Sequence, residues 1–131
     1  MEKHFINYNQ SLALKEFGFD EPCLASWNFY TNEFNYNSYP STFSSDDVIQ
    51  LPLKSQVFEW FRKNHLLGHE INCPFVSYSG KNANIINNGM YELYITDEEQ
   101  LIIKEEDFYN TDYFEAESKA IDKLIEIVKK K

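Results

Sequence analysis

The tract Asn7–Cys23 (NYNQSLALKEFGFDEPC) constrains the fold most, because it specifies both ends of a helix and the entry into a strand. Asn7 is a favourable N-cap, and Gln10 stands at the third helical position, so the two residues form an N-x-x-Q capping box. Gly18 suits the left-handed position that follows a helix, and Pro22 prevents the helix from continuing. The tract therefore predicts a helix, a reversal of the chain and the start of a strand.

Two further helices are predicted, in the middle and at the end of the chain. An apolar stripe at helical spacing marks Leu53–Asn64, and a D-x-x-E capping box at Asp112 starts the last helix. The expected elements, in order, are a helix at about 8–17, a strand at 24–30, an irregular loop rich in aromatic, Asn and Ser residues at about 31–50, a helix at 53–64, strands at 69–79, 91–96 and 101–106, and a helix from about 113.

This order, α-β-α-β-β-β-α, predicts an α+β fold: a small two-layer domain with an antiparallel sheet of about four strands and three helices. A chain of 131 residues fits a single domain, residues 1–131. Pro74 places its strand at a sheet edge or beside a bulge, and Asn88-Gly89 predicts a type I′ hairpin turn. On the first helix, Leu12 is expected to face the core, with Leu14 at the edge of that face.

The composition argues against several classes of protein. The net charge is −9 at pH 7, so phosphate backbones would repel the chain and direct nucleic-acid binding is not expected. Aromatic residues make up 17% of the chain, enough for a ring-rich core without a disulfide or a structural metal. Cys23 and Cys73 form no C-x-x-C pair and are expected to be free thiols in a reducing compartment. No apolar run reaches the length of a membrane span and the first residues do not resemble a secretory signal, so a cytoplasmic location is expected.

No catalytic or metal-binding motif stands out in the sequence. The chain has no G-x-S-x-G elbow and no glycine-rich phosphate loop. His65 and His69 are four residues apart, but Gly68 lies between them, and the adjacent Glu70 gives the order H-x-x-x-H-E rather than H-E-x-x-H. We therefore expect a protein that is not an enzyme, with no catalytic residue, no metal and no cofactor.

The strongest electrostatic feature is the acidic stretch Asp97–Glu117, which holds nine carboxylates and one lysine. One interpretation is a solvated hairpin and helix start, in which some acids stabilise the positive end of the helix dipole. The other is a negative surface that binds a basic partner, for example by mimicking DNA phosphates. Exposed rings on the 31–50 loop would anchor such a partner. The candidate partner-binding residues are Asp97, Glu98, Glu99, Glu105, Glu106, Asp107, Tyr36, Tyr39 and Phe43.

The predicted helices and their flanks contain three segments that resemble known sequences: ALKEFGFDEPC, QVFEWFRKNH and EAESKAIDKLIEIVKK. They resemble the "ALKELGFDEPC", "QAFRWFREKY" and "EAE…KKLIEIVK" segments of an uncharacterised family of small proteins from tailed phages and prophages of gut bacteria. The resemblance implies a phage origin and a location in the host cytoplasm. It implies no reaction, because none of the similar segments is a catalytic motif.

The leading expectation is a small phage accessory protein that acts by binding and inhibits a host or anti-phage defence protein through its acidic surface. Its partner is expected to be a basic or nucleic-acid-binding host protein. One alternative is a homo-oligomer that sequesters a nucleotide signal between its subunits, provided that cationic side chains such as Lys54, Arg62, Lys63 or Lys81 line the pocket. Another alternative is a minor structural component of the virion.

Overall fold

The computed structural model describes residues 2–73, 76–79, 84–87 and 90–131. Within these residues it contains three α-helices, one short 3-10 helix and eight β-strands. In chain order they are η1 (Glu2–His4), α1 (Tyr8–Glu16), β1 (Cys23–Asn28), β2 (Glu33–Ser41), β3 (Val48–Leu51), α2 (Lys54–His65), β4 (Gly68–Asn72), β5 (Val76–Ser79), β6 (Asn84–Asn87), β7 (Tyr91–Thr96), β8 (Ile102–Phe108) and α3 (Tyr113–Lys129).

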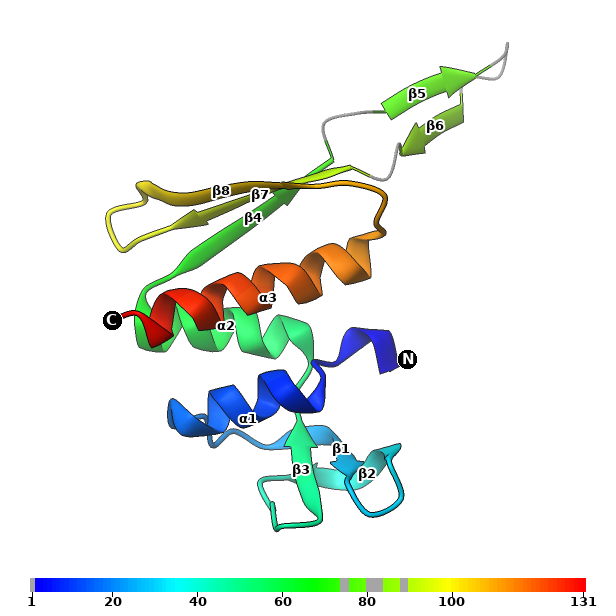
Figure 1. The fold of residues 1–131 in the computed structure, drawn as a ribbon, viewed down its shortest axis with the longest axis vertical. Helices are drawn as coiled ribbons and strands as arrows, with labels where there is room; N and C mark the ends of the chain where they lie inside the picture. The colour runs from blue at the N-terminus through cyan, green and yellow to red at the C-terminus, as the bar shows by residue number, and fades with distance from the viewer. Residues whose placement is uncertain (1, 74–75, 80–83, 88–89) are drawn as a thin grey trace.

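The strands form two antiparallel sheets and a separate hairpin. The first sheet has the strand order β2-β1-β3, the second has the order β4-β7-β8, and β5 pairs with β6. Figure 1 shows α1, α2 and α3 stacked between the two sheets, with the β5–β6 hairpin beyond one end of the stack. Each sheet therefore has one face turned toward the helices and one face turned away from them.

The α+β class with three helices and antiparallel strands is confirmed. The strands form two sheets of three, however, and not the one sheet of about four that was predicted for a two-layer domain. The segment 31–50 was expected to be an irregular loop, yet it contains β2 and most of β3, which pair with opposite sides of β1. Both faces of the edge strand β2 are largely exposed, so its sequence has no alternation of apolar and polar residues to reveal it.

The predicted strand at 69–79 is divided in the structure. Its first part is β4, which pairs with β7, and its last part is β5, which pairs with β6. The predictions at Pro74, Lys81 and the Asn88-Gly89 turn lie outside the described residues.

Local signals placed α1 correctly. The Asn7 side chain accepts a hydrogen bond from the Gln10 backbone N–H (2.8 Å), and the Gln10 side chain accepts one from the Asn7 N–H (3.0 Å). Gly18 has the predicted positive φ, 95°. The buried face was predicted wrongly: Leu12 is 44% exposed and Leu14 is fully buried. The reason is tertiary, since α1 packs against both β3 and α3.

The main hydrophobic core joins all three helices to one face of the second sheet. Its most buried members include Leu14, Phe61, Leu93, Ile95, Ile121 and Leu124. The last helix starts as predicted, because the Asp112 side chain accepts a hydrogen bond from the Glu115 N–H (2.8 Å). A smaller core of Phe5, Ala25, Ile49 and Leu51 lies on the first sheet. The main core therefore attaches the helices to the second sheet, while the smaller core joins Phe5 to the first sheet.

Replacing Gln10 with alanine is expected to lower the free energy of unfolding by about 2 kcal/mol, because buried partners lose their hydrogen bonds. Gln10 is buried, and its amide donates to the Ser118 carbonyl (3.0 Å) and to the Asp122 carboxylate (2.9 Å), which ties α1 to α3. Urea unfolding measures the change. Asn9→Ala, on the exposed side of the same helical turn, is the control, and an equal loss in the two variants would contradict a role for this network.

Candidate functional site

The second sheet has a buried face and an exposed face that carry opposite chemistry. On β7, Tyr91, Leu93 and Ile95 are buried, while the intervening Glu92 and Tyr94 are only partly covered. This alternation follows from the two-residue period of a strand. The helices all lie on the side of the buried residues (Figure 1), so the other face of this sheet is open.

Strand pairing collects four carboxylates on that open face. Glu70 of β4 and Glu105 of β8 flank Tyr94, while Asp107 of β8 lies directly opposite Glu92. Neighbouring strands are about 4.8 Å apart, so these side chains lie within reach of one another. We call Glu70, Glu92, Tyr94, Glu105 and Asp107 the acidic sheet face.

Tyr94 reports the electrostatics of the acidic sheet face. Its hydroxyl donates a hydrogen bond to the Glu92 carboxylate (2.9 Å). This bond raises the pKa of Tyr94 above its usual value, and the negative charges of Glu92, Glu105 and Asp107 add to the effect. A phenolate would be an additional anion among carboxylates, so the phenol stays protonated and serves as a hydrogen-bond donor.

The paired carboxylates work against stability. Like charges directly opposite each other on neighbouring strands are destabilising, and Glu92 and Asp107 are such a pair. Local arrangements that oppose stability are found preferentially at functional sites. The open face therefore carries a charge pattern that folding does not require.

The structure separates the acidic residues that the sequence grouped together. Glu105 and Asp107 belong to the acidic sheet face, whereas Glu106 points to the other side of β8 and pairs with Lys123 of α3 at 3.2 Å. Asp97 organises the turn before β8 by accepting hydrogen bonds from the Glu99 and Leu101 N–H groups (2.9 and 3.0 Å). Glu98 and Glu99 are exposed at that turn. Of the six predicted acids, two therefore lie on the open face.

Three members of the acidic sheet face, Glu70, Glu92 and Tyr94, were missed by the sequence analysis. The alternation in YELYIT does predict a half-buried strand with Glu92 and Tyr94 on one face, but nothing in the pattern marks them as site residues. Their partners could not be found in the same way, because Glu70 is brought beside Tyr94 only by the pairing of β4 with β7. The acids of Asp97–Glu117 are neighbours along the chain, whereas the acidic sheet face collects its carboxylates from three strands.

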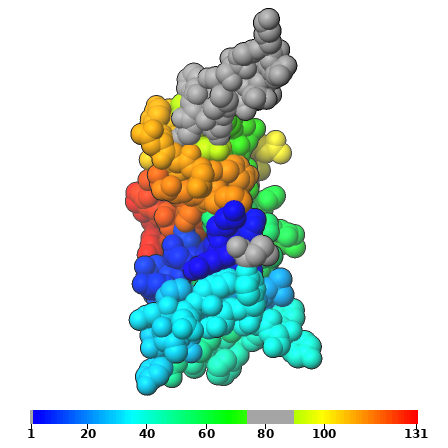
Figure 2. Space-filling view, turned by 90° about the vertical axis from the view of Figure 1, so that its right-hand side faces the viewer, coloured from blue at the N-terminus to red at the C-terminus, as the bar shows by residue number. Residues whose placement is uncertain are grey.

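The predicted aromatic residues lie on a different part of the molecule. Tyr36 and Tyr39 are on β2 and Phe43 follows it, with exposed fractions of 55%, 81% and 65%. Figures 1 and 2 show the first sheet at the opposite end of the helical layers from the second sheet. One compact interface cannot include both the acidic sheet face and these rings. The rings are therefore not brought together with the acids as a single site.

The histidines and cysteines are accounted for by packing. His69 stacks on Phe58 with ring centroids 3.6 Å apart, and its burial, with Arg62 adding to the effect, lowers its pKa to about 4. Burial, with a smaller contribution from Glu21, raises the pKa of the Cys23 thiol to about 12, so this thiol is not a reactive nucleophile. Within the described ranges, no group of three or more His, Cys, Asp or Glu residues could hold a metal ion.

None of the helices in the described part of the chain is both long and apolar enough to cross a membrane. Comparisons with protein-family models, curated proteins and solved structures found no match to this chain.

Proposed function

We propose that this protein acts by binding a cationic partner protein through the acidic sheet face. The observation that carries the proposal is the collection of four carboxylates, from three strands, around Tyr94 on a sheet face that the helices leave open. Arginine side chains fit such a surface, because a guanidinium forms paired hydrogen bonds with carboxylates. The net charge of −9 would speed encounter with a basic partner.

Apolar side chains beside the carboxylates favour a protein over a simple counterion. Leu101, Ile102 and Ile103 are exposed at the start of β8, where Ile102 pairs with Thr96 beside a shift in the register of β7 and β8. Protein interfaces typically combine an apolar centre with a charged rim. β8 is also an edge strand, so its unpaired backbone groups are available to a partner.

The wider role remains part of the proposal. The resemblance of three segments to proteins of tailed phages supports a phage accessory protein, whose partner is a host or anti-phage defence protein. A nucleic-acid-binding protein presents the basic surface that the acidic sheet face complements. In that role the carboxylates occupy the site that phosphates would otherwise fill.

A charge-neutralised variant tests the binding face. Glu70→Gln, Glu92→Gln, Glu105→Gln and Asp107→Asn together remove four charges from the acidic sheet face. The control variant removes four exposed charges elsewhere: Glu16→Gln, Asp20→Asn, Glu33→Gln and Asp46→Asn. Both variants have the same net charge. A difference in partner binding between them therefore shows that the position of the charges matters, and not only their number.

We expect the face variant to lose its partner in pull-downs from host lysate, while the wild type and the control retain the same protein. With that protein purified, the association rate should fall by about tenfold or more and lose most of its salt dependence. The face variant should unfold at equal or higher urea concentration, because the opposed Glu92 and Asp107 charges are gone. Equal binding by all three proteins would overturn the proposal.

A further inference from the structure

A cavity of about 640 Å³ lies among η1, the start of α1, the first sheet and the starts of α2 and α3. It is lined by residues of a single chain, and its size is within the range of small-molecule sites. Trp27 and Leu51 of the first sheet line it and no described residue of the second sheet does, so the cavity is separate from the acidic sheet face. A ligand there would serve a function separate from the proposed protein binding.

The most unusual group in the cavity wall is the ammonium of Lys54, a residue that is only 6% exposed. Among the described residues it has one hydrogen-bond acceptor, the carbonyl of Phe114 at 2.7 Å, although an ammonium has three protons to donate. Burial lowers the pKa of Lys54, while the charges of Glu117 and Asp112 oppose that shift. Lys54 is also the first residue of α2, where the helix dipole disfavours a positive charge. An anion in the cavity would offset both costs.

Other hydrogen-bond donors surround the same space. The ammonium groups of Lys3 and Lys54 lie 4.5 and 5.8 Å from the centre of one ring, that of Phe114. The Asn7 oxygen is occupied by the helix cap, which leaves its amide N–H₂ group to donate. The Ser118 hydroxyl oxygen accepts from Gln10 (3.2 Å), which leaves its proton to donate.

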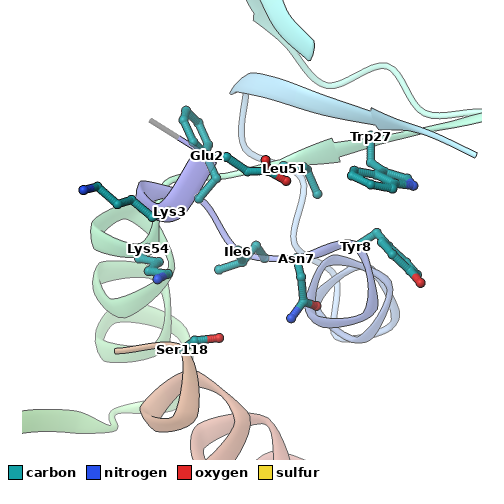
Figure 3. A pocket seen from close by; sticks show the side chains of 10 residues that line it. Glu2, Lys3, Ile6, Asn7, Tyr8, Trp27, Leu51, Lys54 and Ser118 are labelled. Atoms are coloured by element: carbon teal, nitrogen blue, oxygen red, sulfur yellow. The ribbon is translucent and has the colours of Figure 1, made fainter. Parts of the chain in front are cut away.

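Figure 3 shows the polar ends of Lys54, Asn7 and Ser118 directed into a shared space beside Ile6. Among the described residues that line the cavity, the carboxylate is that of the exposed Glu2. The lining thus holds two ammonium groups, of Lys3 and Lys54, and one carboxylate, while Glu117 and Asp112 act on Lys54 from outside the lining.

The rest of the wall is apolar and aromatic. Ile6 and Leu51 are almost fully buried, and they line the cavity together with Tyr8 and Trp27. The Tyr8 and Trp27 rings stack with their centroids 5.3 Å apart. Such a surface suits a planar ring, because aromatic groups gain from both area burial and ring contacts.

We propose that this cavity binds a small aromatic anion, with its carboxylate or phosphate on Lys54, Asn7 and Ser118 and its ring against the Trp27 side of the wall. The site differs from the oligomeric sequestering pocket expected from the sequence, because one chain builds it. It also assigns the cation: Lys54 lines this cavity, whereas Arg62 borders another and Lys63 pairs with Glu59 at 3.0 Å on the surface.

Four phenyl compounds test charge and shape separately: benzoate, phenyl phosphate, the neutral benzamide and the cationic benzamidine. Binding is followed by amide chemical shifts in NMR titrations of the wild type, Lys54→Met and Lys63→Met. Methionine keeps an unbranched apolar side chain and removes the charge, and Lys63 is the matched control on the exposed end of the same helix. Because Lys54→Met also leaves the Phe114 carbonyl without this donor, circular dichroism first establishes that the variant is folded.

We expect at least one of the two anions to bind at least about tenfold more tightly than benzamide, with benzamidine weakest. Lys54→Met should lose about tenfold or more in affinity for that anion and retain its affinity for benzamide, and Lys63→Met should match the wild type. A better fit of benzoate or of phenyl phosphate distinguishes a carboxylate ligand from a phosphorylated one.

Three outcomes would overturn the proposal: equal affinity for anions and benzamide, unchanged anion binding by Lys54→Met, or no saturable binding of either anion in the millimolar range. Should Lys54→Met fail to fold, Lys3→Met, at an exposed position, takes its place. A selective loss of anion affinity in that variant supports the site, and no loss contradicts it. Pull-downs with the acidic-face variants do not depend on this cavity, so each proposal can fail alone.

Discussion

Replacing Phe61 with alanine is expected to lower the free energy of unfolding by about 4 kcal/mol, a large share of the 5–15 kcal/mol typical of a domain. Phe61 is the largest fully buried side chain among the described residues, and it lies on α2 in the core that joins the helices to the second sheet. Removing its ring loses apolar burial and leaves a cavity that the surrounding helices can fill only in part. The midpoint of urea unfolding, followed by circular dichroism, measures the loss.

The matched control makes the same change at an exposed ring. Phe43 is 65% exposed, so Phe43→Ala should change stability by less than about 0.5 kcal/mol. The two variants differ in burial and not in chemistry. Comparable losses in both would mean that the helical layers are not the core on which the second sheet depends.

Lowering the pH from 7 to 4 is expected to cost about 3 kcal/mol of stability through His69 alone. Its pKa is about 4 in the folded protein, against 6.5 for an unperturbed histidine, because the ring is buried against Phe58 and lies near Arg62. Between these two values the unfolded chain binds the proton and the folded chain does not. Stability is therefore complete above pH 6.5 and declines as the pH falls toward 4.

A stacking variant isolates this effect from other groups. His69→Phe keeps a ring on Phe58 but cannot take up a proton, so its loss of stability between pH 7 and pH 4 should be smaller than that of the wild type by about 3 kcal/mol. Burial also lowers the pKa of His65, with Lys131 contributing, and this effect is the same in both proteins. Urea unfolding at pH 7, 5.5 and 4 makes the comparison. Parallel curves for the two proteins would show that His69 titrates normally.

Features that depend on neighbours in the chain were predictable. The Asn7–Gln10 capping box, the positive φ of Gly18 and the Asp112 cap each involve residues at most four positions apart, so sequence patterns report them directly. The apolar stripe of α2 was also predictable, because helical spacing alone places Val57, Phe58, Trp60 and Phe61 on one buried face.

Features that depend on which other elements cover each side of a helix or strand were not predictable from the sequence. α1 packs against β3 on one side and α3 on another, which buries Leu14 and even Gln10 while leaving Leu12 exposed. β2 is exposed along both faces, so its sequence lacks the alternation of apolar and polar residues that predicts a strand. In each case the burial of a residue is set by segments far away in the chain.

In both candidate sites, too, some features follow from near neighbours in the chain and others from distant segments. The amino-acid sequence was sufficient to show a strongly negative chain and an acidic region near β8. It also predicted three helices, from capping motifs or from apolar residues at helical spacing. Only the tertiary structure shows that Glu106 lies on the other side of its strand and that Glu70 and Glu92 lie on the open face. It also shows that Lys54 is buried beside a cavity. The reason is physical: helix capping is a contact between close neighbours, whereas a shared sheet face and a buried charge arise only from strand register and long-range packing.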